Sequence, residues 1–570
     1  MSDNPLIVQS DLTVLVDVSA PRYPAARDAL ARFAELVKSP EHIHTYRISP
    51  LSIWNACAAG VPVVTIVDSL TEFARFTVPP HVLVQVSDFA SRYGRVRIER
   101  DPDSAHGNRL LVFTSDALLA EQLCHGKQLS PLLAERVWPN CFRIAQQDRG
   151  RLKQALIKAG YPAEDVAGYT TGDALPLALR SATRQGLPFA LRDYQQEAVQ
   201  AFHASGEERG GSGVIVLPCG AGKTVVAMGT MAAVQAHTLI LTTSVSAVRQ
   251  WIEELLDKTD IPEDSIGEYG TSSKHVRPIT VTTYQMLTHR ARSDGEFTHL
   301  ALFDQCNWGL IVYDEVHLLP APVFQITSSL QARRRLGLTA TLVREDGRED
   351  DVFALIGPKK ADVPWKALER EGWIAKAVCT EVRVTLPEND RMPYAVAEAR
   401  HKFRLASEHD GKIPVVCNIM ALHPGEPALI IGMYVEQLQR LALALNAPLI
   451  TGSTPQRTRD RLFAEFRAGT LPALVVSKVA NFAIDLPDAS LAIQVSGMFG
   501  SRQEEAQRLG RVLRPKAGAN QAYFYSLVTA DTVEQDFALK RQLFLCEQGY
   551  EYVIRNAHEL GAPAGERNII

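Results

Sequence analysis

A short glycine-rich segment carries residue types that suit phosphate binding. The apolar stretch 213–217 is followed by Pro-Cys-Gly-Ala-Gly-Lys-Thr, which contains Gly220, Gly222, Lys223 and Thr224. Small residues let successive backbone N–H groups converge on phosphates, and a helix that begins after them adds its positive N-terminal end. In such loops the lysine reaches the β- and γ-phosphates and the hydroxyl ligates magnesium. The segment therefore predicts a binding site for ATP and Mg²⁺ at these four residues.

Two carboxylates end a second apolar segment, Leu-Ile-Val-Tyr-Asp314-Glu315-Val-His317. The segment has the pattern of a buried parallel strand, and such strands end at the ligand crevice of an open α/β sheet. Acids in that position need a partner such as a metal ion. We predict that Asp314 holds Mg²⁺ and that Glu315 orients or deprotonates the attacking water. His317 could signal nucleotide state to a neighbouring domain, or could be a hydrogen-bonded histidine at a helix start.

A third segment, far downstream, supplies positive charge. Gln507 is followed by Arg511 and Arg514, which lie three residues apart and so share one face of a predicted helix. Such arginines can neutralise the charge that develops as the γ-phosphate leaves, and Gln507 is a predicted nucleotide contact. A site divided between two distant segments can use hydrolysis to move one domain relative to the other. The arrangement indicates a molecular motor.

Further segments occur in the order that helicases require. Upstream of the phosphate loop, Arg192, Tyr194 and Gln195 resemble an adenine-sensing segment and are predicted base contacts. After the acidic strand, the hydroxyls of Thr339 and Thr341 could link the γ-phosphate site to a nucleic-acid track.

Two departures from the helicase pattern stand among these segments. Leu217 replaces the first glycine of the phosphate loop, as often happens in helicases of the second superfamily. The segment 473–487 resembles the fifth helicase motif and ends in Asp485-Leu-Pro. Asp485 is a predicted coupling residue. Asn481 and Ala483 replace the usual glycines of this motif. The ordered set predicts a helicase more strongly than any one segment does.

A narrower resemblance follows the Thr-Ala-Thr strand. Arg344-Glu345-Asp346 resembles the R-E-D signature of XPB, the xeroderma pigmentosum group B family of DNA helicases, of the bacterial type. The same family is similar to this chain in the segments 5–14, 44–55, 476–482, 500–516 and 547–552. The resemblance implies an ATP-dependent 3′-to-5′ DNA helicase or duplex-DNA translocase that works in DNA repair, with Arg344, Glu345 and Asp346 as coupling residues. Without it, these three residues would also fit a solvated charged turn.

Two alternatives remain open at this level. An RNA helicase would use the same motif chemistry, and a nucleotide-regulated scaffold in a DNA-processing complex would keep part of it. Intact Lys223, Thr224, Asp314, Glu315, Arg511 and Arg514 favour the motor. DNA is the expected partner, and a repair nuclease or other repair proteins are open as further partners.

Composition sets outer bounds. The chain has 570 residues, of which 46% are hydrophobic, and a formal net charge of −4, so a DNA track would have to be a local basic stripe. No apolar run of about 18 residues exists, so no membrane span is expected. The eight cysteines are scattered without a C-x-x-C pair, which favours a reducing, cytoplasmic location.

The predicted fold class is α/β, with two RecA-like motor domains in tandem behind an α+β N-terminal domain. We expect an accessory domain at 1–145, a short linker or damage-recognition-like region at 146–186, and the first motor domain at 187–362. A bridge with an abbreviated thumb-like element follows at 363–412, and the second motor domain at 413–570. Within the accessory domain, 82–86 is expected to be a strand, and 87–98 fits a winged-helix-like module or another α+β unit. Arg333-Arg334-Arg335 fits the end of a helix.

Overall fold

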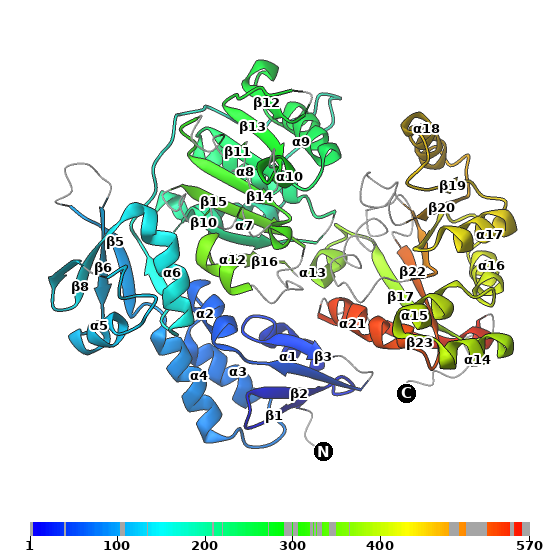
Figure 1. Cartoon of the computed structure of the whole chain (residues 1–570), viewed down its shortest axis with the longest axis horizontal. Coiled ribbons are helices and arrows are strands. Elements are labelled where there is room, and N and C mark those ends of the chain that lie inside the picture. The colour runs from blue at the N-terminus through cyan, green and yellow to red at the C-terminus, as the bar shows by residue number, and fades with distance from the viewer. Residues whose placement is uncertain are drawn as a thin grey trace.

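Four β-sheets organise the chain (Figure 1). The computed structural model describes residues 4–38, 42–102, 109–133, 135–207, 210–218, 220–271, 273–289, 299, 302, 306–319, 323, 327, 333–340, 349–363, 365–477, 489–496, 521–547 and 552–560. Two sheets form in the N-terminal part, and two parallel sheets follow. None of the helices within the described residues has the length and apolar composition to cross a membrane.

The first sheet is antiparallel, in the order β1-β2-β4-β3. Its strands are β1 (Leu6–Val8), β2 (Thr13–Asp17), β3 (Glu35–Lys38) and β4 (Ile43–Arg47). Four helices belong to this unit: α1 (Tyr23–Leu30), α2 (Pro50–Ala58), α3 (Val63–Glu72) and α4 (Pro80–Arg92). The expected strand at 82–86 is wrong, because these residues lie inside α4, whose buried Val82 and Val86 are one helical turn apart.

The second sheet has the order β7-β8-β6-β5-β9. Its strands are β5 (Val96–Arg100), β6 (Arg109–Thr114), β7 (Glu135–Trp138), β8 (Cys141–Ala145) and β9 (Ala163–Asp165), with helices α5 (Ala117–Cys124) and α6 (Arg149–Lys158). Because β9 pairs in parallel with β5, the domain boundary that was expected at residue 145 would divide one sheet. The structure thus divides the N-terminal part differently from 1–145 and 146–186.

The first parallel sheet has the order β12-β13-β11-β14-β15-β10-β16. Its strands are β10 (Ser212–Val216), β11 (Thr238–Thr242), β12 (Ile266–Tyr269), β13 (Ile279–Thr283), β14 (Leu310–Asp314), β15 (Arg334–Thr339) and β16 (Lys359–Asp362). The helices of this part are α7 (Asp193–His203), α8 (Lys223–Val234), α9 (Val245–Lys258), α10 (Tyr284–Leu287), α12 (Glu349–Leu355) and α13 (Trp365–Arg370). The central strands are buried on both faces, which explains their continuous Val, Ile and Leu runs.

The second parallel sheet has the order β19-β20-β18-β21-β22-β17-β23. Its strands are β17 (Lys376–Val384), β18 (Ala428–Gly432), β19 (Leu449–Ile450), β20 (Ala473–Ser477), β21 (Leu491–Gln494), β22 (Gln521–Thr529) and β23 (Tyr552–Asn556). Its helices are α14 (Glu388–Val396), α15 (Ala399–Glu408), α16 (Lys412–Leu422), α17 (Val435–Leu445), α18 (Gln456–Arg467) and α21 (Val533–Glu547). Since β17 pairs with β22 and β23, the expected bridge at 363–412 already contains a strand of this sheet.

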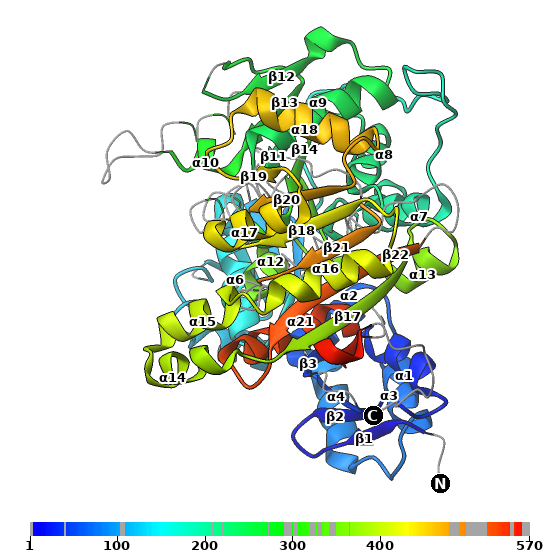
Figure 2. The ribbon, with the colours of Figure 1, turned by 90° about the vertical axis from the view of Figure 1, so that its right-hand side faces the viewer.

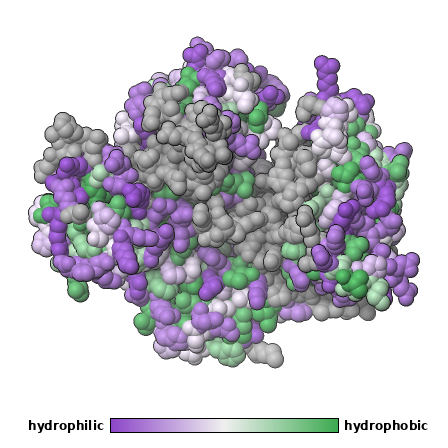
Figure 3. Space-filling view, in the orientation of Figure 1, coloured by the Kyte–Doolittle hydropathy of each residue, from purple (hydrophilic) through white to green (hydrophobic). Residues whose placement is uncertain are grey.

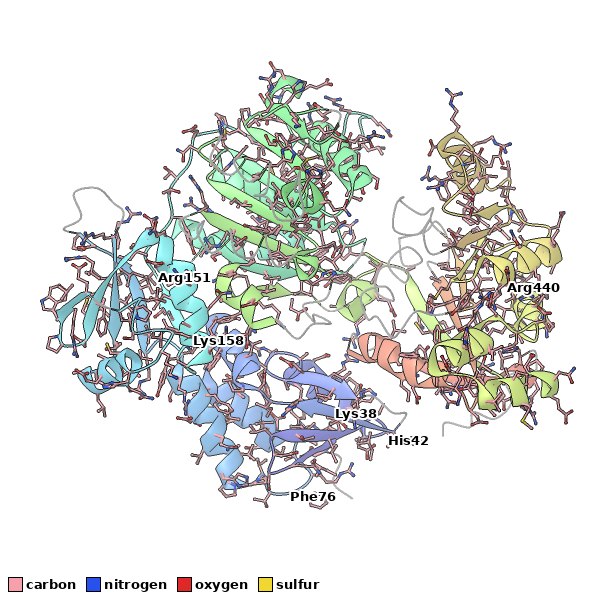
Figure 4. The ribbon with its side chains drawn as sticks, viewed as in Figure 1. Lys38, His42, Phe76, Arg151, Lys158 and Arg440 are labelled. Carbon is pink, nitrogen blue, oxygen red and sulfur yellow. The ribbon has the colours of Figure 1, made fainter. Side chains whose placement is uncertain are left out.

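The two parallel sheets lie in separate parts of the molecule, apart in Figure 1 and one in front of the other in Figure 2. The N-terminal units lie along the first of them. Trp54 of α2 and Ile157 of α6 belong to a buried apolar cluster that also includes Val352 and Phe353 of α12. β3, at the edge of the antiparallel sheet, contacts α21, a helix of the second parallel sheet; Lys38, which ends β3, is labelled in Figure 4. The N-terminal part therefore touches the units of both parallel sheets.

The arginine run 333–335 does not close a helix as expected, because Arg334 and Arg335 begin β15. The Arg335 side chain is fully buried. Its guanidinium donates to the carbonyl of Leu355 at 2.7 Å and to the Ser212 hydroxyl at 3.0 Å. These hydrogen bonds let a cation sit in the interior.

Candidate active site

Three strands bring the predicted catalytic segments to one edge. In the first parallel sheet β14, β15 and β10 are neighbours. Their carboxyl ends are Asp314, Thr339 and Val216. Parallel strands end on the same side, so the phosphate loop after β10 and the acidic residues after β14 meet there.

The phosphate loop turns into α8 at Gly222, which has a φ of +82°. A side chain there would be strained, and its Cβ would lie 2.5 Å from Nε2 of Gln195. Gly220 also has a positive φ, of +83°. Lys223 and Thr224 occupy the first turn of α8 and are half-buried. The loop therefore has the backbone that its glycines predict.

An ion pair joins the two halves of the predicted site. The Lys223 ammonium donates to Oε1 of Glu315 at 2.5 Å. Both side chains are mostly buried, at 12% and 17% exposed, so water screens their charges only partly. Glu315 itself has a φ of +50°, a left-handed conformation that is uncommon for a residue with a side chain. It occurs at the turn directly after β14.

Asp314 is held by two aromatic residues that the motifs did not reveal. The indole of Trp251 donates to Oδ2 of Asp314 at 3.0 Å, and the Tyr284 hydroxyl donates to its backbone carbonyl at 2.8 Å. Burial and the neighbouring Glu315 raise the pKa of Asp314 to about 6, against the opposing effect of Lys223. A buried carboxylate beside a second one is a position where a cation is favourable.

In the sequence, Trp251 and Tyr284 look like ordinary residues of the hydrophobic core. Trp251 is spaced with Val248 and Leu255 along one buried face of α9, which predicts packing and nothing more. Their contact with Asp314 depends on how the sheet is assembled.

His317 and Thr339 lie together, from different strand ends. Nδ1 of His317 and the Thr339 hydroxyl are 2.7 Å apart, and the same nitrogen is 3.5 Å from Oε2 of Glu315. His317 is 4% exposed and Thr339 is fully buried. His317 is thus a hydrogen-bonded histidine, and its partners are two of the predicted site residues.

The three predicted base contacts have different surroundings. The Tyr194 hydroxyl and the Gln195 amide both donate to the carbonyl of Ala221 in the phosphate loop, at 2.8 and 3.0 Å. Oε1 of Gln195 accepts from the backbone N–H of Arg192 at 3.0 Å. Tyr194 and Gln195 are buried, whereas Arg192 is half-buried. Tyr194 and Gln195 therefore support the phosphate loop, and Arg192 is the more accessible of the three.

The remaining predicted site residues lie outside the described residues: Thr341, Arg344, Glu345, Asp346, Asp485, Gln507, Arg511 and Arg514.

The fold and this edge define a class of protein. A parallel α/β sheet that gathers a phosphate loop, two carboxylates and a histidine at its carboxyl edge, followed by a second parallel sheet, is the architecture of a motor with two RecA-like domains.

Family profiles agree with that class. The profile described as "ERCC3/RAD25/XPB C-terminal helicase" matches residues 368–564. The profile "Type III restriction enzyme, res subunit" matches residues 188–344. The profile "Helicase conserved C-terminal domain" matches residues 6–137, which lie in the N-terminal units.

Relatives are similar over nearly the whole chain. "DNA 3'-5' helicase XPB" of Mycobacterium tuberculosis is 52% identical, covering 99% of this chain and 100% of that protein. The protein of the same name from Kineococcus radiotolerans is 53% identical, covering 98% of each chain. The "General transcription and DNA repair factor IIH helicase/translocase subunit XPB" of Enterocytozoon bieneusi is 31% identical, covering 96% of this chain and 92% of that protein.

The chain belongs to the XPB family of DNA 3′-5′ helicases. Membership confirms the predicted class of enzyme, an ATP-dependent DNA helicase.

Proposed function

We propose that the chain couples ATP hydrolysis to 3′-to-5′ movement on DNA, as a helicase or duplex-DNA translocase that works in DNA repair. The observation that carries the proposal is the convergence of Lys223, Asp314 and Glu315 at the carboxyl edge of the first parallel sheet. Each has the chemistry that phosphoryl transfer requires: a cation for the phosphates, an acid for a metal and an acid for water.

The Lys223–Glu315 ion pair suggests how ATP binding prepares the site. A triphosphate that enters the loop offers Lys223 several negative oxygens in place of one carboxylate. Lys223 then turns to the phosphates, and the Glu315 carboxylate is released to orient the attacking water and accept its proton. The hydrogen bond between His317 and Thr339 would pass this change on to the end of β15.

Asp314 and Thr224 fit magnesium. One offers a buried carboxylate that is already held in place, and the other a hydroxyl in the first turn of α8. Oxygen donors of this kind are those that Mg²⁺ prefers. When bound, the ion would neutralise phosphate charge. In this proposal Arg511 and Arg514 contribute from the second motor domain, with Gln507 as a further nucleotide contact.

DNA is the proposed substrate and partner, with repair proteins, a nuclease among them, as further partners. The relative from Enterocytozoon bieneusi is named as a subunit of a transcription and DNA repair factor, which supports a role in an assembly. The scattered cysteines fit work in a reducing cytosol.

An ATPase assay with no nucleic acid, single-stranded DNA, duplex DNA and RNA tests the proposal. We expect greater stimulation by DNA than by RNA. The stimulation should fall steeply with salt, because each phosphate contact contributes a slope of about −0.9 in log K against log salt on duplex DNA. Equal or greater stimulation by RNA would indicate an RNA helicase, and ATP binding without turnover would indicate a scaffold.

Two variants test whether ATP is hydrolysed at this site. Lys223→Ala should lower ATP hydrolysis by at least about 10²-fold, since a positioned charge at the phosphates is lost. Glu315→Gln should lower turnover similarly but retain ATP binding, because Asp314 remains. Circular dichroism should match that of the wild type in both. Wild-type hydrolysis by folded Lys223→Ala protein would place the active site elsewhere.

A further inference from the structure

Arg192 stacks on an aromatic ring that no motif includes. The guanidinium carbon of Arg192 lies 4.3 Å above the ring of Trp373, within cation–π distance. Trp373 stands between α13 and β17 in the sequence and is 38% exposed. Its indole N–H donates to Oε2 of Glu371 at 3.0 Å. The Trp373 ring therefore has two partners, the Arg192 guanidinium and the Glu371 carboxylate.

This stack is joined to the phosphate loop by hydrogen bonds. The Arg192 guanidinium donates to the Tyr194 hydroxyl at 3.2 Å, and that hydroxyl donates to the carbonyl of Ala221 at 2.8 Å. These contacts connect Trp373 and Arg192 to the loop that is proposed to hold the phosphates of the nucleotide. Among the described residues, no carboxylate lies within ion-pair distance of Arg192, so its plane is held by Trp373 and Tyr194.

A flat guanidinium held in this way is suited to a nucleobase. The planar cation stacks on aromatic rings with one face, and its other face offers the same interaction to a purine. Without Trp373 the arginine would sample its rotamers, and ordering it would then cost free energy on each binding event.

Trp373 also stands where the two motor domains are connected. The next residues, Ile374 and Ala375, are buried in the apolar cluster that contains Tyr194 and Met231 of the first motor domain and Cys379 and Phe524 of the second parallel sheet. β17 of the second sheet begins at Lys376. A base that stacks on Arg192 would therefore contact a side chain held by the segment at which the second motor domain begins.

We propose that Trp373 is a positioning residue of the nucleotide site: it holds the Arg192 guanidinium flat against the purine base of a nucleoside triphosphate, from the segment that joins the two motor domains. The proposal rests on the proposed function, because it adds a residue to the same ATP site.

The test separates base binding from phosphate binding. ATP binding and inhibition by inorganic tripolyphosphate, which lacks a base, are measured with magnesium and DNA for the wild type, Trp373→Ala, Trp373→Leu and Trp373→Phe. In the Ala and Leu variants we expect ATP affinity to fall about 5- to 30-fold, the range of a lost cation–π contact and its ordering effect. Tripolyphosphate inhibition should stay within about twofold of the wild type. Turnover at saturating ATP should also be kept, and Trp373→Phe should restore most of the affinity.

Trp138→Ala is the control and should leave both affinities unchanged, because Trp138 is a more exposed tryptophan on β7, in the second N-terminal sheet. Arg192→Ala should lose at least as much ATP affinity as Trp373→Ala, and the double variant should lose no more than Arg192→Ala alone. Unchanged ATP affinity in Trp373→Leu, or equal losses for ATP and tripolyphosphate, would overturn the inference. A wild-type protein that binds no ATP would instead refute the proposed function.

Discussion

Trp251 shows how one side chain outside the motifs can position a catalytic group. Its indole N–H reaches Oδ2 of Asp314 from α9, at 3.0 Å. Hydrogen bonds of this kind orient the ligands of a metal, and losing one typically costs about 10- to 100-fold in metal affinity or activity. The residue is 2% exposed, so it acts through Asp314 rather than by touching the nucleotide.

We predict that Trp251→Phe raises the magnesium concentration for half-maximal ATPase activity by about 10-fold. Trp308→Phe is a matched control, because Trp308 is also buried and donates its indole N–H, to the carbonyl of Leu302 at 3.0 Å. Magnesium titrations of both variants at saturating ATP make the comparison. The same magnesium requirement in the two variants would show that Trp251 only fills space.

At the scale of elements, a buried ion pair joins the starts of α16 and α21. The Lys412 ammonium donates to both carboxylate oxygens of Glu534, at 2.9 and 2.8 Å, and to the carbonyl of Val495 at 2.9 Å. Both side chains are 0% exposed. The backbone N–H of Thr529 also donates to Glu534, at 2.9 Å. Two helices and the ends of β21 and β22 therefore share one pair of charges.

Removing one partner should loosen these elements more than neutralising both. We predict that Lys412→Met costs about 3–5 kcal/mol of local stability, because Glu534 would remain buried without its cation. Lys412→Met with Glu534→Gln should cost clearly less, since the neutral amide still accepts from Thr529. Hydrogen exchange of amides in α16 and β21 reports this local opening. Equal exchange rates in the two variants would contradict the prediction.

At the scale of the whole molecule, a charged cluster of α6 and β9, in the second N-terminal sheet, interacts electrostatically with Arg335 of the first motor domain. The Asp165 carboxylate on β9 accepts from Arg149 of α6 at 2.8 and 2.6 Å and lies 3.2 Å from the Lys153 ammonium. Arg335 of β15 also lowers the pKa of Asp165. Burial, with the nearby Arg335 and Arg149, lowers the pKa of Lys153 to about 8, despite the opposing effect of Asp165.

Asp165→Asn should weaken this interaction, because it leaves buried cations without their counter-charge. We predict a loss of about 3–5 kcal/mol, seen as faster hydrogen exchange in α6 and α12, which pack together. Asp148→Asn is the control: its pair with Arg151, on the exposed face of α6 (Figure 4), is 3.3 Å long and should contribute about 0–1 kcal/mol. Similar exchange in the two variants would contradict the role of the cluster.

The same carboxylate gives the interaction a pH dependence. Arg149 and Lys153 hold the pKa of Asp165 well below its ordinary value against the effect of burial. A lowered pKa in the folded state means that the contribution is complete above about pH 4 and is lost as the pH falls below that value. In Asp165→Asn, exchange in α6 should be insensitive to this titration.

The outer surface is consistent with these buried contacts. On the face that Figure 3 shows, hydrophilic residues are spread over the accessory units and the second motor domain, with smaller hydrophobic groups among them. Exposed apolar side chains of the first accessory unit include Val64, Phe76 and Val84. The buried ion pairs Lys223–Glu315, Lys412–Glu534 and Arg149–Asp165 each lie inside one unit, away from this surface.

The sequence determined the local chemistry of the site. Glycines before Lys223 predict the loop that the structure contains, because only residues without a side chain adopt its backbone easily. The apolar run before Asp314 predicts a buried parallel strand, because such a strand is covered on both faces. The order of the motifs predicted a helicase with two motor domains, and the resemblance of segments such as 344–346 predicted the family; the architecture and the comparisons confirm both predictions. The roles of the individual site residues stay predictions.

Only the tertiary structure decided which distant residues meet. The pairing of Lys223 with Glu315, the contact of Trp251 with Asp314 and the stack of Trp373 on Arg192 join segments from different strands and helices. Periodicity reports which face of an element is buried, not which neighbour it packs against. The same limit explains the expected strand at 82–86, where an apolar spacing fits either a strand or a helix, and the packing of the accessory unit selects the helix.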